Sequence, residues 1–409
     1  MSTNFKKFLL LWSGELVSSI GGGLTSFGLG VYIYNMTGSA AGMSLVTLLG
    51  FLPTLVLGVP AGVLADKYDR RLLMMIGDGC SAIGIIYILI AMMTGGASLT
   101  EICIGVTISS VFSALLEPSF KATITDILTK EEFSKASGLV SMAGSARYLF
   151  SPVIAGFLLS VSDVKLLLII DICTFFLTVI SAAVVRKGTP TNAKEEDISF
   201  GESLKEGWSI ITGNKGVLML VFVASFITLF MGVFQILAEP FVLSFSSPKT
   251  LGIAETVCAC GMLVTAIYLG IRGVKKKFAL LMSLSLMLAG AFMFGFVLTT
   301  NVVVICVFGF LFFAALPIAN NCLDYLIRTN IRADAQGRAW GLIGFLSQIG
   351  YVIAYAVSGV AADAVGAATG RGVGFGSGTV IQVAGVMLLV IAGSILPMRS
   401  IRKLENQPE

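Results

Sequence analysis

The chain has 409 residues, of which 56% are hydrophobic and only 12% are charged, with a formal net charge of +4. Soluble domains carry about 25% charged residues, so this composition excludes an ordinary soluble protein and indicates an all-α protein with many membrane spans. The 46 glycines suit such a protein, because glycine lets membrane helices approach closely. There is no histidine, so any proton chemistry must use carboxyl groups.

Apolar runs separated by charged or turn residues predict twelve spans. The first run starts at Phe8, behind Lys6 and Lys7, and is long enough to be a retained helix rather than a cleaved signal. The predicted spans are residues 8–33, 41–65, 72–94, 102–122, 137–160, 164–186, 216–245, 250–271, 278–298, 302–326, 338–361 and 376–398.

One connection is long and polar, and it divides the spans into two groups of six. The predicted parts are a first bundle at 1–186, a linker at 187–215, a second bundle at 216–400 and a tail at 401–409. Within the linker, apolar residues such as Leu204, Trp208 and Ile211 alternate with charged ones. This pattern fits an amphipathic helix on the inner membrane surface, and it fits a solvated linker helix equally well.

The basic residues predict the orientation. If both termini are cytoplasmic, nearly all of the 27 Lys and Arg residues lie on the inner side, where membrane proteins concentrate them. Only Lys165, Lys249 and Arg371 fall outside, and Arg147 falls within a span. We therefore expect a multi-pass protein of the bacterial cytoplasmic membrane with both ends inside.

The two halves also resemble each other. Glu117-Pro118 near the end of the fourth span is echoed by Leu316-Pro317 in the tenth. After each pair comes a charged loop, and then a helix that opens with Ser137-Gly138-Leu139 or Trp340-Gly341-Leu342. A repeat of six helices is the plan of many secondary transporters, in which the substrate binds between the halves.

The loop between the second and third spans carries the most specific motif. Its residues Gly62-Val-Leu-Ala-Asp66-Lys67-Tyr-Asp69-Arg70-Arg71 resemble the signature G-x-L-A-D-[RK]-x-G-R-[RK] of the major facilitator superfamily. Only the second glycine departs, because Asp69 takes its place. Together with the twelve-span layout, this resemblance implies the two-bundle fold of that superfamily and a transport function.

Shorter matches resemble one branch of the superfamily, the bacterial efflux proteins that include macrolide exporters and siderophore exporters. These matches are Trp12-Ser-Gly14-Glu15, "TGSA" at 37–40, "GFLP" at 50–53, "SP" at 151–152 and "GR" at 337–338. Antiporters of the family often carry a glycine-rich motif in the fifth span, of which Gly144, Pro152 and Gly156 form only a loose version.

The resemblance also implies a role for the loop. In the family fold the second span packs beside the eleventh, which here begins near Gly337-Arg338. A helix N-terminus carries roughly half a positive charge, so Asp66 is expected to latch the two halves together. Arg70 and Arg71 are expected to bind neighbouring carboxylates, with Asp78 as one candidate. The alternative is that the loop, including Gly62, only sets topology.

Ionisable groups within spans are costly unless paired or hydrated, and they are therefore functional candidates. Glu15 lies in the first span, Glu117 in the fourth and Arg147 in the fifth. We expect Glu15, Glu117 and Arg147 to couple transport to protons or substrate. Because an unpaired arginine is implausible there, Glu15 and Glu117 are its expected partners. Glu15 alternatively makes a structural hydrogen bond to the fifth or eleventh span.

A second set of polar residues is expected to line the transport cavity. It consists of Glu239, Glu255, Asn320, Asn321, Asp324 and Tyr325. Asn321, Asp324 and Tyr325 share one helix face by their spacing. Asp171, on a span that is usually peripheral, is expected to serve packing. Several aromatic residues either form an apolar pocket or simply pack, namely Trp12, Phe226, Phe230, Phe234 and Trp340.

Other chemistry is not expected. The seven cysteines lie in apolar runs and are interpreted as packing residues, so no metal site, cofactor or catalytic residue is predicted. The chain has no phosphate-binding loop for ATP. The expected partners are a small-molecule substrate, protons and the lipid bilayer, with no nucleic acid, and the expected state is a monomer.

The leading hypothesis is a proton-coupled exporter of amphipathic, drug-like compounds that works by alternating access. One alternative is an exporter of an endogenous metabolite such as a siderophore or lipid, in which Arg147 binds an anionic group of the substrate. The other is a membrane receptor or scaffold that transports nothing.

Overall fold

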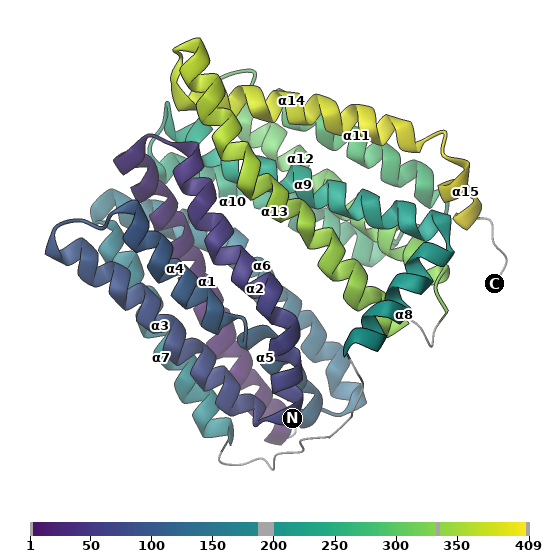
Figure 1. The fold of residues 1–409 in the computed structure, drawn as a ribbon, viewed down its shortest axis with the longest axis horizontal. Coiled ribbons are helices and arrows are strands. Elements are labelled where there is room, and N and C mark those ends of the chain that lie inside the picture. Colours follow the sequence, from purple (N-terminus) through teal and green to yellow (C-terminus); the bar gives the residue numbers. More distant parts are fainter. Residues whose placement is uncertain (1–2, 187–199, 333–335, 406–409) are drawn as a thin grey trace. The chain divides into compact units, whose positions relative to one another are not determined.

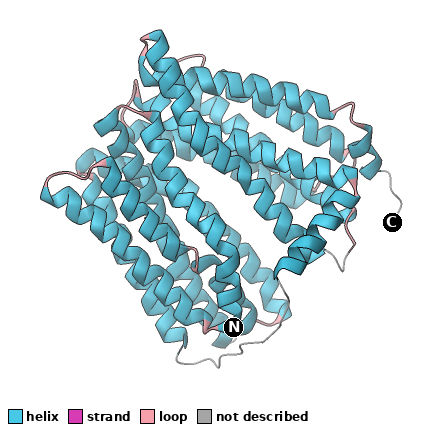
Figure 2. Cartoon of the chain, in the orientation of Figure 1, coloured by secondary structure: helices cyan, strands magenta, loops and turns pink. Residues whose placement is uncertain are grey.

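The computed structural model describes residues 3–186, 200–332 and 336–405, and the described residues form helices and loops without a strand (Figure 2). Within them, twelve helical segments are long and apolar enough to cross a membrane. Each coincides with a predicted span, from Asn4–Thr37 at one end of the chain to Gly372–Ile395 at the other. The predicted all-α membrane fold with twelve spans is therefore confirmed.

Most of the helices follow one another with short connections (Figure 1). In the first half of the chain they are α1 (Thr3–Thr37), α2 (Ala40–Lys67), α3 (Arg70–Thr94), α4 (Leu99–Ser113), α5 (Leu116–Ile127), α6 (Lys130–Val161) and α7 (Val164–Arg186). In the second half they are α8 (Phe200–Gly213), α9 (Lys215–Leu243), α10 (Pro248–Arg272), α11 (Phe278–Phe296), α12 (Val302–Thr329), α13 (Gln336–Thr369), α14 (Gly372–Ile395) and α15 (Arg399–Glu405).

The chain divides into two compact units. The first contains α1, α3 to α7, most of α2 and residues 251–253. The second contains α8, α9, most of α10, α11 to α15 and residues 39–44, at the start of α2. The predicted domain boundaries stay a prediction.

Glycine spacing sets the packing of the first unit. Gly14, Gly21 and Gly28 recur every seven residues along α1, and each lies against α7. A Cβ atom at Gly21 would overlap the Thr174 hydroxyl and crowd the Asp171 carboxyl. The absence of side chains on this stripe therefore brings α1 close enough to α7 for polar groups to bond between the helices.

An apolar cluster fills one end of this unit, where α1 and α3 begin and α5 and α7 end. It consists of Phe8, Leu11, Met74, Phe120, Ile124, Ile127, Ala136, Ala182 and Val185. Glu15 lies one turn beyond Leu11 on α1, and Asp78 lies one turn beyond Met74 on α3. The cluster therefore separates these two acidic residues from the loop that joins α2 to α3.

Aromatic packing is prominent in the second unit. Phe234 of α9 stacks on Phe312 of α12 with ring centroids 4.4 Å apart, and it meets the edges of Phe296 and Phe313. The α9 helix packs mainly on α13 and α14.

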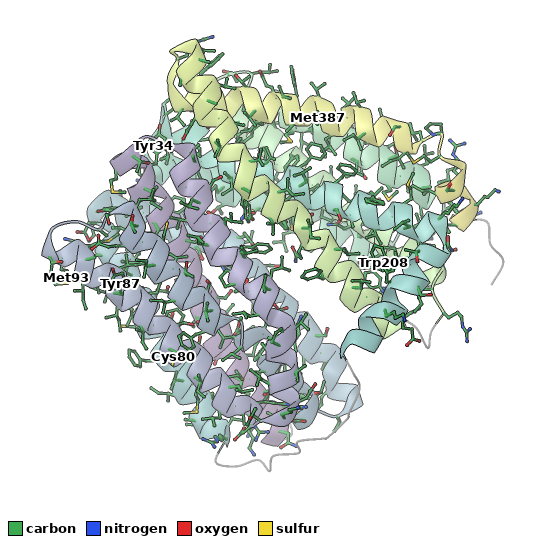
Figure 3. The ribbon with its side chains drawn as sticks, in the orientation of Figure 1. Tyr34, Cys80, Tyr87, Met93, Trp208 and Met387 are labelled. Atoms are coloured by element: carbon green, nitrogen blue, oxygen red, sulfur yellow. The ribbon has the colours of Figure 1, made fainter. Side chains whose placement is uncertain are left out.

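The linker helix α8 belongs to the second unit and packs on α13 and α9. Its Ile211 is fully buried, whereas Trp208 is 52% exposed (Figure 3). One face of α8 thus packs against the other helices of the second unit. This packing explains part of the amphipathic pattern of the linker sequence. The remaining linker residues, 187–199, lie outside the described residues.

The second unit also contains a helix cap. The carboxylate of Asp363 on α13 accepts hydrogen bonds from the Ser39 hydroxyl and from the backbone N–H groups of Ala40 and Ala41, at 2.9 and 3.1 Å for the two amides. These amides open α2, so the carboxylate lies at the positive end of the helix dipole.

Candidate functional site

The fourth span is broken where a cavity forms. Helix α4 ends at Ser113 and α5 starts at Leu116. Ala114 and Leu115 between them keep helical dihedral angles, but the Leu115 amide bonds to the carbonyl of Phe112, three residues back, so the regular helical hydrogen bonding is interrupted. Pro118 follows two residues later and lacks the N–H that would bond to the carbonyl of Ala114, four residues back. The break carries Glu117 into the first turn of α5, where negative charge is favourable.

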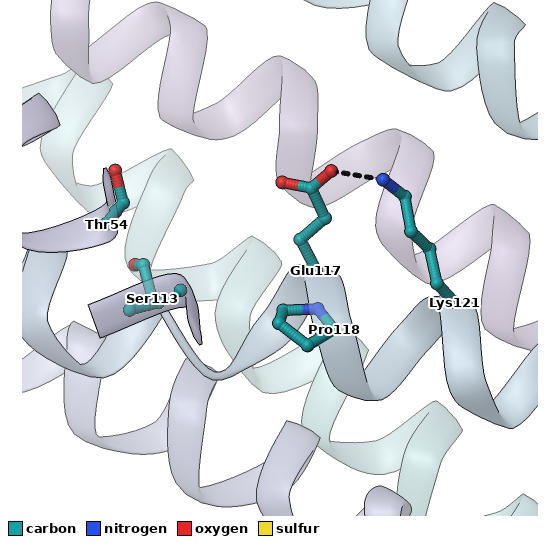
Figure 4. A pocket seen from close by; sticks show the side chains of 7 residues that line it. Thr54, Ser113, Glu117, Pro118 and Lys121 are labelled. Carbon is teal, nitrogen blue, oxygen red and sulfur yellow. Dashed lines mark hydrogen bonds and ion pairs between the residues drawn. The ribbon is translucent and has the colours of Figure 1, made fainter. Parts of the chain in front are cut away.

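The cavity at this break has a volume of about 400 Å³. It is lined by Thr54, Gly58, Ser113, Ala114, Glu117, Pro118 and Lys121, all in the first unit (Figure 4). Glu117 is exposed and forms an ion pair with Lys121, with 2.5 Å between Oε1 and Nζ. This cavity is lined by both polar and apolar groups, and its charged groups are already paired with each other.

Glu15 is half-buried on α1. Its carboxyl is within electrostatic reach of Glu117 and of Asp78 on α3. Glu117 thus influences Glu15 electrostatically, and because both groups are acids, both need a positive charge or a proton nearby. Their role in coupling stays a prediction.

Asp171 has a structured environment on α7. Its side chain is buried, and one oxygen accepts a hydrogen bond of 2.6 Å from the Thr25 hydroxyl on α1, across the glycine stripe. The Thr174 hydroxyl lies 3.4 Å from the other oxygen. The sequence-based expectation of a mere packing residue missed these bonds, because it placed α7 at the periphery.

Arg147 is exposed on α6 and its stem lies beside Gly23 of α1. The carboxylate on which it acts electrostatically is Asp171. Among the described residues it forms no ion pair within 4 Å with either Glu15 or Glu117. The expected pairing with those two glutamates is thus absent from the described residues, and Arg147 influences Asp171 electrostatically without an ion pair within 4 Å.

Two glutamates meet in the second unit. Glu239 near the end of α9 and Glu255 in the second turn of α10 are half-buried and interact electrostatically with each other. No basic side chain is paired with either one in the described part of the chain. Two such carboxyls can bind a cationic group or share a proton.

The polar face of α12 is exposed. Asn320, Asn321, Asp324 and Tyr325 are all accessible, whereas Cys322 and Leu323 between them are buried. The Tyr325 ring stacks on Phe278, with centroids 3.7 Å apart. Its ring is thus engaged in packing as well as exposed.

The aromatic candidates separate into packing and accessible residues. Phe230 and Phe234 are buried, whereas Phe226 is exposed and lines an apolar groove with Met219 and Phe222. Trp12 donates a 2.6 Å hydrogen bond to the carbonyl of Leu139 on α6, and Trp340 lies under the Arg328 guanidinium.

The motif loop is stabilised by local contacts. Arg70 donates to the carbonyls of Ala65 and Ala122 and forms an ion pair of 2.6 Å with Asp126 of α5. Asp66 is 69% exposed, and its nearest ion pair is a longer one of 3.5 Å with Arg70. A Cβ atom at Gly62 would meet open space. The side chain of Arg71 is buried.

Asp69 has a defined role, although it replaces a glycine of the family signature. It is the N-cap residue of α3 and accepts a hydrogen bond from the Arg71 amide. Its other oxygen pairs with Arg186 at the end of α7, at 2.7 Å. The ion pair of Asp69 is therefore with Arg186 of α7, and not with a basic residue of its own loop.

The latch between Asp66 and the start of α13 stays a prediction. The side chains of Gly337 and Arg338 lie outside the described residues. The described residues also contain no group of three His, Cys, Asp or Glu side chains that could bind a metal ion.

Comparison with known proteins gives the family. The model of the Major Facilitator Superfamily matches residues 11–355. Macrolide efflux protein A of Streptococcus pyogenes is 27% identical over 377 residues, which cover 88% of this chain and 90% of that protein. The protein of the same name from Enterococcus faecalis is 27% identical over 327 residues, covering 76% of this chain and 98% of its own.

Solved structures share the fold at lower identity. A bacterial homolog of the human lysosomal transporter Spinster, in an inward-facing and unoccupied conformation, has a TM-score of 0.75 and 15% identity, with both chains covered fully at 100%. A bacterial homologue of the iron transporter ferroportin has a TM-score of 0.73 and 13% identity, covering 96% of this chain and 100% of that one. These likenesses concern the fold alone. With the family model matching most of its length, the chain belongs to the major facilitator superfamily of membrane transporters.

Proposed function

We propose that this transporter exports amphipathic, cationic, drug-like compounds, macrolides among them, in exchange for protons. The observation that carries the proposal is the half-buried carboxyl of Glu15 inside a membrane span, within electrostatic reach of Glu117 at the edge of a polar cavity. The relatives named macrolide efflux protein A support the substrate class.

Proton coupling follows from competition for the same negative charge. A carboxylate that binds a cationic substrate in one conformation and a proton in the other ties the two movements together. Glu15 has no arginine or lysine within 4 Å among the described residues, so it is available for both ligands. The proton and the cationic substrate can therefore replace each other on Glu15 without a basic side chain having to move away first.

Recognition of cations is assigned to Glu239 and Glu255 as well. Because the two carboxyls repel each other and have no basic partner in the described ion pairs, a cationic substrate group between them relieves the repulsion. The protein is assigned to the bacterial cytoplasmic membrane as a monomer with both termini inside, and the Asp66 loop acts as its inner latch.

A second candidate function rests on Arg147. Its guanidinium is exposed, and the described residues place no carboxylate within 4 Å of it. Such a group suits a carboxylate or phosphate of an anionic metabolite. Export of a siderophore or an anionic lipid would use this arginine for binding, whereas drug export would not.

The test is a flux assay with the full chain in proteoliposomes and an imposed pH gradient, using radiolabelled erythromycin, ethidium and a ferric siderophore in separate runs. Erythromycin and ethidium should move against the proton gradient, and the Glu15→Gln variant should lose this dependence because a neutral amide cannot exchange a proton.

The matched control is Glu206→Gln, an exposed glutamate on α8. It should transport as the unmodified chain does. If Glu15→Gln keeps its response to the pH gradient, the assignment of Glu15 is wrong. If only the siderophore moves, and Arg147→Gln abolishes that movement, the second candidate function replaces the first.

A further inference from the structure

Asp78 is a buried acidic residue without an ion pair among the described residues. It lies in the third turn of α3, on the same helix as the labelled residues Cys80, Tyr87 and Met93 in Figure 3, and its side chain is 1% exposed. Neither carboxyl oxygen has a hydrogen-bond donor in good geometry, although the Thr178 hydroxyl of α7 acts on this carboxyl group. Asp171, also buried, accepts hydrogen bonds from two threonines. Well-formed hydrogen bonds therefore compensate for the burial of Asp171, and no such bonds compensate for the burial of Asp78.

The groups around Asp78 offer no positive charge. The charged groups that act on it are Glu15 from α1 and Asp171 from α7, and both are acids. Arg147 on α6 acts on Asp171. Thr178 of α7 also faces Asp78, but its hydroxyl lies 3.3 Å from the carbonyl of Thr174 and 3.4 Å from that of Gly14. From α4, the Ser113 hydroxyl contacts Ser81, one turn along α3.

A carboxylate cannot remain charged in such a place without a large cost. Transfer of an unpaired anion out of water costs several kcal/mol even after the protein relaxes, and two neighbouring acids add to that cost. The neutral acid avoids most of it. The geometry thus favours a protonated Asp78, buried on α3 and facing groups of α1 and α7.

Asp78 is also adjacent to the break in the fourth span. Gly77, the residue before it, packs against Leu116 at the start of α5, where an added Cβ would lie 2.9 Å from a Leu116 methyl group. Glu117 is the next residue along α5. Any movement of this break therefore bears directly on the backbone that carries Asp78.

We propose that Asp78 is a proton-carrying residue of the transport cycle, which stores a proton in this conformation and exchanges it with Glu15. The inference rests on the proposed function. In the exchange, the O–H bond of Asp78 breaks and an O–H bond forms on a Glu15 carboxylate oxygen, so Asp78 is left as the anion and Glu15 is neutral. No electrons are transferred and no other reactant is consumed.

Infrared spectroscopy of the full chain in liposomes tests the stored proton without any substrate. At neutral pH, the difference between the unmodified chain and Asp78→Asn should show the loss of one protonated-carboxyl band. Asp163→Asn, which changes an exposed aspartate in the α6–α7 loop, should show the loss of a carboxylate band instead. Loss of a carboxylate band from Asp78→Asn would overturn the proposal.

The thermal stability of the protein gives a second test of whether Asp78 is protonated. Asn has nearly the shape of a protonated Asp, so the thermal midpoint of Asp78→Asn in detergent should not be lower than that of the unmodified chain. A marked drop would mean that a charged Asp78 binds a partner, a sodium ion included, and the proposal would fail. A sodium-dependent rise in the midpoint of the unmodified chain would count against it equally.

Flux of radiolabelled erythromycin in proteoliposomes tests the role in transport. Asp78→Asn should lose the flux driven by the pH gradient and keep the exchange of erythromycin at equal pH, and Asp78→Glu should restore part of the driven flux. If the unmodified chain responds to the gradient and Asp78→Asn responds equally, Asp78 is not a carrier. If the unmodified chain ignores the gradient, the proposed function fails and the role of Asp78 fails with it.

Discussion

The fourth and tenth spans occupy corresponding places in the two halves and carry a proline at corresponding positions, yet they differ in backbone hydrogen bonding. The fourth is divided into α4 and α5, whereas α12 runs unbroken from Val302 through Pro317 to Thr329. Glu117 stands before the proline of the broken span and is exposed at a cavity, and Leu316 stands before the other and is 4% exposed. The interrupted hydrogen bonding thus accompanies the exposed glutamate, and the continuous helix accompanies the buried leucine.

The comparison extends to the rest of each unit. In the first, polar groups lie between helices, at Asp171 and Thr25 and at Asp78. In the second, aromatic rings around Phe234 fill the corresponding interior, and the unpaired acids Glu239 and Glu255 lie toward the ends of their helices. The first unit is therefore the better candidate for proton movement, and the second for binding apolar cations.

The largest expected effect comes from exchanging the residues before the two prolines. Leu316→Glu buries a charge in an unbroken helix and should lower the free energy of unfolding by about 3 kcal/mol. Glu117→Leu acts at an exposed site and should change it by no more than about 0.5 kcal/mol. Unfolding in mixed micelles measures both, and equal effects would contradict the contrast between the two spans.

The glycine stripe of α1 supplies the next test. Gly21→Val should destabilise the first unit by about 2 kcal/mol, because the new side chain overlaps Thr174 and crowds Asp171. Gly22→Val is the matched control on the adjacent residue, where an added Cβ meets nothing within 4 Å. The two variants have the same change in helix propensity, so a similar loss of stability in both would disprove the close packing of α1 on α7.

The prolines themselves should differ. Pro317→Ala restores a backbone donor inside a continuous helix and should stabilise the protein by about 1 kcal/mol. Pro118→Ala should have almost no effect on stability, because Pro118 lies in the first turn of α5, where the N–H has no helical partner. The thermal midpoints of both variants check this, and a larger gain for Pro118→Ala would mean that the proline creates the break.

The smallest expected effect separates two ion pairs of α5. Asp126→Asn removes the partly buried pair with Arg70 and should cost about 1 kcal/mol. Lys121→Gln removes the exposed pair with Glu117 and should cost about 0.3 kcal/mol or less. The difference should persist at high salt, which screens exposed charges more strongly. If high salt removes the effect of Asp126→Asn, the Arg70 pair is an ordinary surface contact.

Much of the fold was predictable, because long apolar runs have only one way to satisfy their backbone in a bilayer. The pairings within the site were less so. The sequence identifies Glu15 as an ionisable residue within a span, but the electrostatic influence of Arg147 on Asp171 depends on which way α6 and α7 face. Arg70 and Asp126 are 56 residues apart and Asp69 and Arg186 are 117 apart, with no local pattern to join them. The sequence indicates Asp78 only as a possible partner for Arg70 or Arg71. Its burial without a well-formed hydrogen bond depends on how the helices pack, which no local pattern shows.

The contact of Asp69 with Arg186 has a consequence for how the family signature evolves. A glycine at position 69 would provide neither the cap of α3 nor a charge for Arg186, and an arginine at 186 would then have no reason to be retained. We expect the two positions to change together across relatives of this chain, with an acid at one accompanying a base at the other. The alignment of many such sequences would decide this, and independent variation would show that the ion pair is incidental.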